Sequence, residues 1–280
     1  MPWNKLQVIL KEIAPTGHFA LAYSGGVDSR FAAHAAQKMG FAPLLLHVQG
    51  PHIPQSESAY ARRWAAARGL SLRELVVSPM DLPAVAAGTR ERCYACKHRL
   101  FSRLRDVADG LPLCDGTHAS DTQGYRPGRK ALKELNIYSP LALARLSKAD
   151  IRQLGRMTGL DDPDQSARPC LLTRLNYGLA PSPELLTMIA NGEQAAADVL
   201  RTAFGERTPD FRLRLTAPDR WELHLRSRDD TREVPPSVQH DLTQALRKRA
   251  HVPVACIAVM DTLSGYFDQK NYADPQGRRI

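Results

Sequence analysis

A short string of glycine, hydroxyl and carboxylate side chains, Ser24–Ser29, indicates chemistry more directly than any other part of this 280-residue sequence. It reads Ser-Gly-Gly-Val-Asp-Ser, follows the apolar run 18–23 and precedes an alanine-rich segment, 30–39, of helical composition. Glycines let a phosphate approach the backbone, and the N–H groups and dipole at a helix start favour an anion. The string therefore predicts an anion-binding loop between a strand and a helix, with Asp28 either fixing the loop or holding Mg²⁺. It is not a Walker A loop, because the lysine of that pattern is absent.

Three of the five cysteines lie in polar, motif-like surroundings: Cys93, Cys96 and Cys170. Cys93 and Cys96 are three residues apart, so both can face one side of a helical turn. Such a pair is compatible with a redox couple, half a zinc site or part of an iron–sulfur site. The other two, Cys114 and Cys256, fall in apolar strand-like runs and are expected to be buried packing residues. An odd number of cysteines in a chain without an export signal argues against a disulfide framework.

The elements that must position these residues alternate between strands and helices along the first part of the chain. Strands are expected at 18–23, 42–48, 72–77 and 111–114, with helices at 27–39, 56–68, 93–107 and 148–157. This alternation predicts an α/β fold with a parallel sheet. Pro181–Pro183 is the best boundary candidate, so the expected domains are 1–180 and a smaller α/β domain, 181–280. The second domain is expected to contain helices 184–204 and 238–249 and strands 211–216, 221–226 and 252–260.

Further motifs follow the glycine string in a fixed order along the chain. They are Arg92–Lys97, Asp115–Asp121, Tyr125–Gly128, Ser139–Leu141, Ser147–Arg152 and Arg168–Gly178. In content and order the set resembles the PP-loop ATP pyrophosphatases, and among them the LarE-type sulfur transferases that help to make the nickel-pincer nucleotide cofactor. The resemblance runs from residue 24 to about 178 and continues more weakly to 271.

The resemblance implies a Rossmann-like PP-loop domain of the adenine nucleotide alpha hydrolase type. Family members transfer AMP from ATP to a substrate carboxylate and release pyrophosphate. The residues that match ATP-binding positions are Ser24, Gly25, Gly26, Asp28, Ser29 and Arg126. Mg²⁺ would accompany ATP, with Asp28 as its protein ligand.

The resemblance also makes Cys170 the sulfur site, and family members use this cysteine in two ways. In one, it attacks the adenylated carboxylate, loses its own sulfur and becomes dehydroalanine. In the other, three cysteines hold a [4Fe–4S] cluster whose fourth iron carries an exchangeable sulfide. The joint presence of Cys93, Cys96 and Cys170 favours the cluster. A zinc site completed by His98 is disfavoured, because His98 lies only two residues after Cys96 and makes a cramped chelate.

The C-terminal part departs from the family pattern at several positions. Alternation along a strand puts Arg212 and Arg214 on one face, where they resemble the arginines that bind the substrate's nucleotide phosphate. The alternative is an exposed edge strand with arginines for solubility. His224 and Phe267 replace a glutamate and an arginine of the family, and His118 and Ser120 replace an asparagine and an aspartate. These changes bear on the substrate, which the resemblance implies is a nucleotide-like carboxylic acid.

Charge keeps a second class of partner open. The net charge of +9 resides in residues 1–180, which contain 24 Lys and Arg against 15 Asp and Glu. Six of these bases fall within 90–105, a cluster that suits polyphosphate or RNA, or equally a solvated helix face. A tRNA thiolase of the PP-loop type is therefore an alternative, although no extra RNA-binding domain is evident. Two others are an amide-forming PP-loop synthetase, which does not explain Cys170, and a nucleotide- and cluster-binding module without turnover.

Membrane association is not expected. The apolar runs are too short to span a bilayer, and the N-terminal residues lack the features of a secretory signal. A cytoplasmic protein is therefore the expectation. The resemblance further implies a homo-oligomer.

Overall fold

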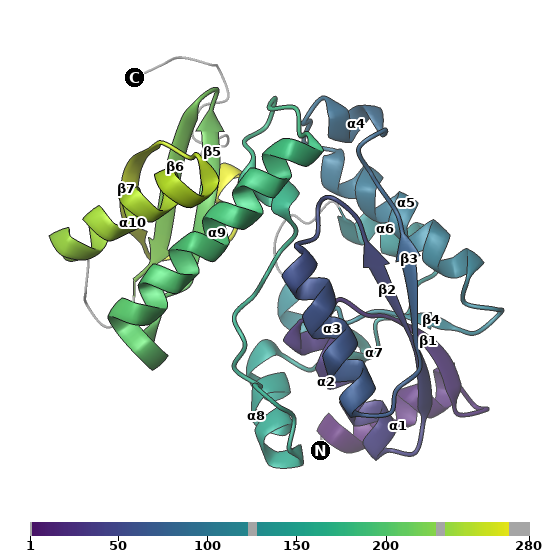
Figure 1. The fold of residues 1–280 in the computed structure, drawn as a ribbon. Coiled ribbons are helices and arrows are strands. Elements are labelled where there is room, and N and C mark those ends of the chain that lie inside the picture. Colours follow the sequence, from purple (N-terminus) through teal and green to yellow (C-terminus); the bar gives the residue numbers. More distant parts are fainter. Residues whose placement is uncertain (1, 123–127, 228–232, 269–280) are drawn as a thin grey trace. The chain divides into compact units, whose positions relative to one another are not determined.

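The computed structural model describes residues 2–122, 128–227 and 233–268, which form two compact units (Figure 1). The first unit comprises Met1–Val85 and Glu91–Pro169, and the second comprises Ala86–Arg90 and Cys170–Ile280. After the short segment Ala86–Arg90, the chain enters the second unit a second time at Cys170 and stays in it. This crossing precedes the proline-rich boundary candidate at 181–183. No helix among the described residues combines the length and the apolar character needed to cross a bilayer.

The first unit alternates helices with four strands. Its strands are β1 (His18–Ala22), β2 (Ala42–Gln49), β3 (Leu72–Val76) and β4 (Leu113–Cys114). Its helices are α1 (Pro2–Ile13), α2 (Val27–Lys38), α3 (Gln55–Ala67), α4 (Pro83–Ala86), α5 (Arg92–Asp106), η1 (Ala119–Thr122), α6 (Gly128–Glu134), α7 (Pro140–Leu143) and α8 (Lys148–Thr158).

All four strands of this sheet are parallel, in the order β3-β2-β1-β4. Ala20 in the central strand pairs with Leu44 on one side and with Leu113 on the other. The parallel α/β sheet expected from the sequence is therefore confirmed. The chain moves from β1 to β2 and β3 in one direction and returns to the opposite side of β1 as β4. Ligands of such sheets bind outside the carboxyl ends of the strands at this point of reversal, between β1 and β4.

Two hydrophobic clusters cover the two faces of the sheet. Phe19 and Leu21 of β1 pack with Phe31 of α2 and Leu10 of α1 in one cluster. Ala20 points the other way and packs with Leu104 of α5 in the second. This alternation is what a strand buried on both faces requires, and it explains the near-continuous apolar runs in the sequence. The sheet thus holds the ends of β1 and β4 on a rigid core.

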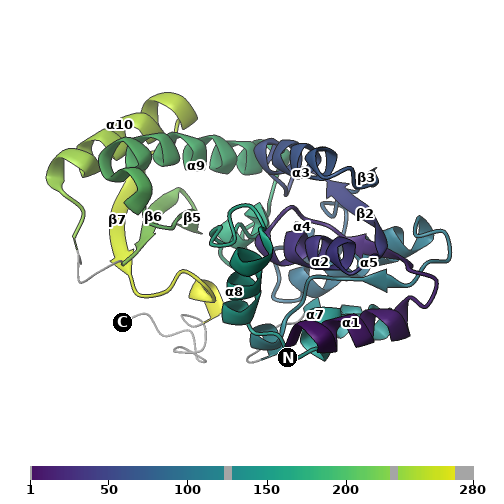
Figure 2. The same cartoon turned by 90° about the horizontal axis from the view of Figure 1, so that it is seen from below.

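The second unit is a small α/β layer of its own. It contains η2 (Leu171–Arg174), α9 (Pro183–Phe204), η3 (Gly205–Arg207), β5 (Phe211–Ala217), β6 (Arg220–Arg226), α10 (Pro236–Ala250) and β7 (Val254–Met260). Strand β6 lies in the centre, antiparallel to β5 and parallel to β7. Helices α9 and α10 run side by side over the same face of the three strands (Figures 1 and 2).

One sequence expectation about this unit is wrong. Cys256 was expected to be buried, but it is exposed on β7, an edge strand of the sheet. A short apolar run does not distinguish a strand covered on both faces from an edge strand covered on one. Cys114, by contrast, is buried at the end of β4 as expected, and burial raises the pKa of its thiol.

Candidate active site

The loop Ser24–Ser29 joins β1 to α2, and its own hydroxyl groups hold it in shape. The Ser29 hydroxyl donates to the Gly26 carbonyl oxygen at 3.0 Å and accepts from the Ser24 N–H at 3.3 Å. The Gly26 N–H donates to the Ser24 hydroxyl at 3.3 Å. Gly26 occupies the N-cap position of α2, so the N–H groups of the first helical turn follow directly. This is the strand–loop–helix arrangement that the sequence predicts for an anion site.

Gly25 has φ +78°, a left-handed conformation that residues with a Cβ rarely adopt. A Cβ at this position would lie 2.9 Å from the Cβ of Ala61 on α3. The loop is therefore pressed against a neighbouring helix on one side. Both the backbone conformation and the lack of space require glycine here.

Arg30 supports the loop from behind, although the sequence suggested no role for it. Its guanidinium is fully buried and donates from Nε to the Gly25 carbonyl oxygen at 3.1 Å. The other nitrogens reach across the chain to the carbonyl oxygens of Asp161 and Asp162, at 2.5 and 3.0 Å, and to Gln165 Oε1 at 3.1 Å. All four of these acceptors are uncharged oxygens, so among the described residues no carboxylate is hydrogen-bonded to this cation.

The segment after β4 meets the loop at the point of chain reversal. A Cβ on Gly116 would lie 3.0 Å from the backbone nitrogen of Ser29, so a larger residue would push the two backbones apart. The neighbouring carboxylate of Asp115 is buried and accepts from the Thr117 N–H at 3.1 Å and the Ser139 hydroxyl at 2.7 Å. Burial raises the pKa of Asp115, and these hydrogen bonds oppose the increase. The turn after β4 thus lies directly against the start of α2.

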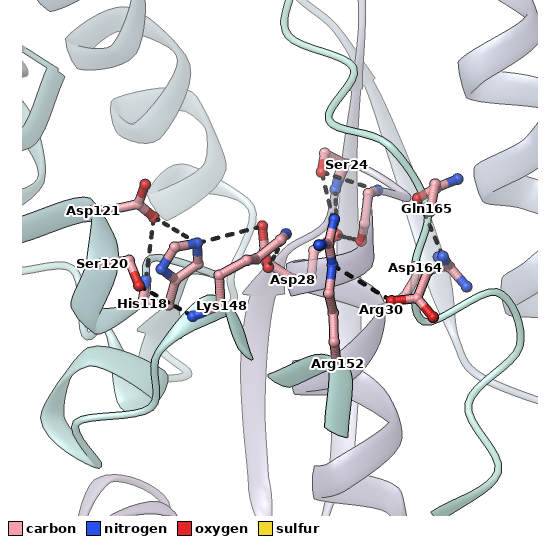
Figure 3. A network of polar contacts seen from close by, with 12 residues as sticks. Ser24, Asp28, Arg30, His118, Ser120, Asp121, Lys148, Arg152, Asp164 and Gln165 are labelled. Carbon is pink, nitrogen blue, oxygen red and sulfur yellow. Dashed lines mark hydrogen bonds and ion pairs between the residues drawn. The ribbon is translucent and has the colours of Figure 1, made fainter. Parts of the chain in front are cut away.

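A network of charged and polar side chains surrounds Asp28 (Figure 3). Lys148 Nζ lies 2.6 Å from Asp28 Oδ1. The largely buried ring of His118 places Nε2 3.9 Å from Asp28 Oδ2 and 3.4 Å from Asp121 Oδ2. The Lys148 N–H also donates to the Ser120 hydroxyl at 3.1 Å. Lys148 belongs to a motif recognised in the sequence, but nothing there indicated its partner, which lies 120 positions earlier.

These residues fit a phosphate group. The start of α2 provides backbone donors, and Lys148 adds a cation. Within the described parts of the chain, no three His, Cys, Asp or Glu side chains are grouped to hold a metal ion. Magnesium that arrives with a nucleotide commonly takes only one or two carboxylates and fills its shell with phosphates and water. Asp28 therefore stays the predicted Mg²⁺ ligand, and Arg126, the remaining predicted ATP contact, lies outside the described residues.

Cys93 and Cys96 lie one turn apart at the start of α5. This helix leads from β3 to the parallel strand β4, so it begins at the carboxyl edge of the sheet, on the side of the phosphate loop. Cys96 is buried and Cys93 is half-buried. The next residue, Lys97, packs so closely on Gly128 that a Cβ there would lie 2.4 Å from Lys97 Cδ.

Cys170 is half-buried and is the first residue of the second unit after the final crossing. It occupies the N-cap position of η2, and its carbonyl oxygen accepts from the Thr173 N–H at 3.1 Å and from the Thr173 hydroxyl at 2.8 Å. The segment that carries Cys170 is thereby locked into a short, well-defined turn. The same turn ends at Arg174, which is buried and pairs with Glu193 through Nε at 2.6 Å and Nη2 at 3.0 Å.

Arg212 and Arg214 alternate along β5, as the sequence predicts. Arg214 is buried, and its Nη1 donates to His224 Nδ1 at 2.5 Å while its Nη2 donates to the Leu263 carbonyl oxygen. Its guanidinium lies 4.6 Å from the centre of the Tyr266 ring. Burial, reinforced by the positive charge of Arg174, lowers the pKa of both Arg212 and Arg214 to about 10. Three guanidinium groups of the second unit therefore influence one another electrostatically.

His224, which stands where the family has a glutamate, completes a buried chain of polar contacts in the second unit. Its Nε2 lies 2.8 Å from Glu222 Oε2, and Glu222 Oε1 accepts from Arg220 Nε at 2.8 Å and from the Thr216 hydroxyl at 3.0 Å. Because Nδ1 accepts from Arg214, the proton of the neutral imidazole must sit on Nε2 and point at Glu222. Arg214 on β5 and Glu222 on β6 thus fix the tautomer of His224.

Comparison with known proteins identifies relatives but matches no family model. The uncharacterized protein slr1717 of Synechocystis is 31% identical over 194 residues, 68% of this chain and 72% of its own. The uncharacterized protein MJ0830 of Methanocaldococcus jannaschii is 28% identical over 206 residues, 72% of this chain and 79% of its own. The pyridinium-3,5-bisthiocarboxylic acid mononucleotide synthase of Lactiplantibacillus plantarum is 25% identical over 179 residues, 62% of this chain and 65% of its own. The chain therefore belongs to the family of slr1717, and this synthase, a LarE-type protein of the PP-loop superfamily, is a distant relative.

Proposed function

We propose that this protein is an AMP-forming, ATP-dependent sulfur transferase that acts on a carboxylic acid. The observation that carries the proposal is the close approach of the turn at Gly116 to the backbone of Asp28 and Ser29, where α2 begins, at the point of chain reversal in the parallel sheet. This position suits a phosphate chain lying across the carboxyl ends of β1 and β4. The distant similarity to a synthase of a bisthiocarboxylic acid supports the sulfur chemistry.

In the first stage, an oxygen of the substrate carboxylate attacks the α phosphorus of ATP, and the bond to the pyrophosphate oxygen breaks. The N–H groups at the start of α2 and the hydroxyls of Ser24 and Ser29 hold the departing pyrophosphate. Because Arg30 fixes the loop, these donors are already oriented before charge develops on the leaving group. The products are an acyl adenylate and pyrophosphate.

In the second stage, a sulfur nucleophile adds to the acyl carbon and AMP leaves, which yields a thiocarboxylate. A [4Fe–4S] cluster held by Cys93, Cys96 and Cys170 would supply this sulfur as sulfide at its open iron, with three thiolates as ligands. In the alternative form of the proposal, Cys170 donates its own sulfur. The position of Cys93 and Cys96 one turn apart on α5 fits two ligands of one centre.

The substrate, in this proposal, is a nucleotide-like acid bound through its phosphate by the second unit. Arg174, Arg212 and Arg214 gather there, and burial strengthens their attraction for an anion. Arg174 is paired with Glu193, so the proposal keeps Arg212 and Arg214, which share one face of β5, as the phosphate contacts.

The proposal is tested by incubating anaerobically purified protein with ATP and a panel of nucleotide-like carboxylic acids. We expect AMP and pyrophosphate in equal amounts only when a cognate acid is present, and about four irons and four labile sulfides per chain for a cubane cluster. Cys93→Ala and Cys170→Ala should each lose the iron, whereas the control Cys256→Ala, on exposed β7, should retain it. Normal iron content in both variants would eliminate the cluster.

If iron is absent from the wild-type protein, mass spectrometry after turnover should reveal the loss of one sulfur at Cys170. Failure to release pyrophosphate with every acid would instead favour a binding module without turnover. Tight binding of tRNA would favour the thiolase alternative. Of the bases on α5, Arg99 pairs with Asp81 at 3.2 Å and Arg103 with Asp106 at 3.5 Å. The homo-oligomer implied by the resemblance stays part of the proposal.

A further inference from the structure

We propose that Lys148 is an exchangeable phosphate-binding residue, which neutralises Asp28 before ATP binds and moves to the phosphates when ATP arrives with its divalent cation. This inference rests on the proposed function, because it assumes that the loop 24–29 takes ATP. Lys148 lies in the sequence motif Ser147–Arg152, which by itself indicated no role for this side chain. The ion pair between Lys148 Nζ and Asp28 Oδ1, at 2.6 Å, is its starting point.

A carboxylate beside a phosphate site repels the phosphate, because both groups are negatively charged. Asp28 occupies the second position of α2, directly behind the loop that is built to attract an anion. Asp121 adds a second carboxylate within 3.4 Å of His118 Nε2, which itself lies 3.9 Å from Asp28 (Figure 3). Without a nearby cation these groups would repel the phosphates of ATP. The ammonium of Lys148 supplies this positive charge, 2.6 Å from Asp28 Oδ1.

The backbone of Lys148 is held firmly, so only its side chain is free to change partners. Ser147 forms a capping box with Asp150, in which each side chain bonds the other residue's backbone, and the Lys148 N–H bonds the Ser120 hydroxyl. Lys148 is the first residue of α8, and its side chain is about a quarter exposed. A lysine carries three donors on a flexible stem, which allows it to exchange one anionic partner for another without backbone movement.

Binding of ATP supplies both halves of the exchange. The divalent cation that accompanies the nucleotide gives Asp28 a new positive partner, and the phosphates give Lys148 a new negative one. Lys148 would then hold pyrophosphate from the β4 side of the site, opposite the N–H groups at the start of α2. Loss of this contact should weaken nucleotide binding itself, before any sulfur is transferred.

The test measures the dissociation constant of α,β-methylene-ATP, which is not cleaved at the reacting bond, for the full chain in the presence of Mg²⁺. We expect Lys148→Met to bind about 10- to 100-fold more weakly, the effect of losing one charge-assisted bond. Lys130→Met is the matched control, because Lys130 is exposed on α6 and its side chain reaches Glu134 at 3.8 Å. Its affinity should equal that of the wild type.

A second pair of variants separates exchange from simple neutralisation. If Lys148 moves to the phosphates, the same loss persists when Lys148→Met is added to Asp28→Asn. If the loss vanishes in that background, Lys148 is only the counter-ion of Asp28 and the proposal is wrong, as it also is if Lys148→Met binds like the wild type. Unchanged circular dichroism and melting temperature exclude misfolding, and Lys148→Gln serves as a second neutral variant. Should the wild type itself bind no nucleotide, the proposed function fails along with this inference.

Discussion

At the scale of single residues, the most informative side chain is a buried arginine that contacts the phosphate loop from within the protein. Arg30 satisfies its hydrogen bonds with carbonyl oxygens and an amide, and its guanidinium also lies 5.8 Å from the Trp64 ring centre and 5.4 Å from that of Tyr60. Neutral acceptors stabilise the cation without cancelling its charge. Arg30 therefore both fixes the shape of the loop and contributes positive potential behind it.

Replacing this arginine should affect stability and anion binding together. We expect Arg30→Met to lower the free energy of unfolding by about 3 kcal/mol or more, because several buried acceptors lose a charged donor at once. Urea denaturation measures the change. Arg62→Met is the control, since Arg62 pairs with Glu74 at the surface and should cost less than about 1 kcal/mol. Equal losses in the two variants would contradict this account.

At the scale of elements, strand β1 is bracketed by two glycines in the same unusual conformation. Gly17 precedes the strand with φ +81°, and Gly25 follows it with φ +78°. A Cβ at Gly17 would meet nothing within 4 Å, whereas one at Gly25 would press on Ala61. The two positions therefore separate the cost of backbone conformation from the cost of crowding.

This difference leads to a paired prediction. Gly17→Ala should cost only the left-handed conformation, about 1 kcal/mol, whereas Gly25→Ala should cost about 2–4 kcal/mol because overpacking is added. Thermal unfolding of both variants measures the difference. Gly25→Ala should also bind nucleotide less tightly, as its loop must shift away from α3. Similar stabilities for the two variants would show that α3 yields without strain.

At the scale of the whole molecule, the two units should respond differently to acid. Burial lowers the pKa of three histidines in the first unit: that of His52 falls to about 4, and those of His34 and His47 also fall below their usual value. In the second unit burial would raise the pKa of Glu222, but hydrogen bonds from Arg220, His224 and Thr216 outweigh it and hold the value at about 2. The three histidines whose pKa is lowered by burial therefore all lie in the first unit.

We expect the first unit to lose stability as the pH falls from about 6.5 towards 4, because its neutral histidines must then be protonated. The contribution of His52 is complete above about pH 6.5 and amounts to about 3 kcal/mol lost by pH 4. The Glu222 contribution is complete above its usual pKa and is lost only as the pH falls towards 2. Trp3 and Trp64 report on the first unit and Trp221 on the second, so fluorescence of Trp221→Phe isolates the first transition.

A substitution of His52 tests the cause of this acid sensitivity. Neither ring nitrogen of His52 has a hydrogen-bond partner among the described residues, so an apolar side chain of similar size should be tolerated at pH 7. His52→Leu should flatten the pH dependence between 6.5 and 4. An unchanged slope would assign the effect to His34 and His47 instead.

The sequence predicts the parts of this fold that depend on local pattern. The strand before Ser24, the helix from Val27 and the shared face of Arg212 and Arg214 follow from periodicity and glycine chemistry, which act over a few residues. Arg30 also reaches Asp161 and Lys148 reaches Asp28, partners more than a hundred positions away that depend on how α8 and the following loop return to β1. No local pattern encodes such contacts, so the network around Asp28 required the structure.

The short excursion Ala86–Arg90 has a consequence for how the protein is made. In the folded protein this segment belongs to the second unit, where the Gly88 carbonyl oxygen accepts from the N–H of Gly178. During translation Gly88 is synthesised 90 residues before Gly178. At about 5–20 residues per second, several seconds pass between the two during synthesis. Cys93 and Cys96 are synthesised soon after Gly88, whereas Cys170 is synthesised shortly before Gly178. Any centre that needs all three thiols can thus be loaded only after translation has passed the first unit, which makes its assembly a late maturation step.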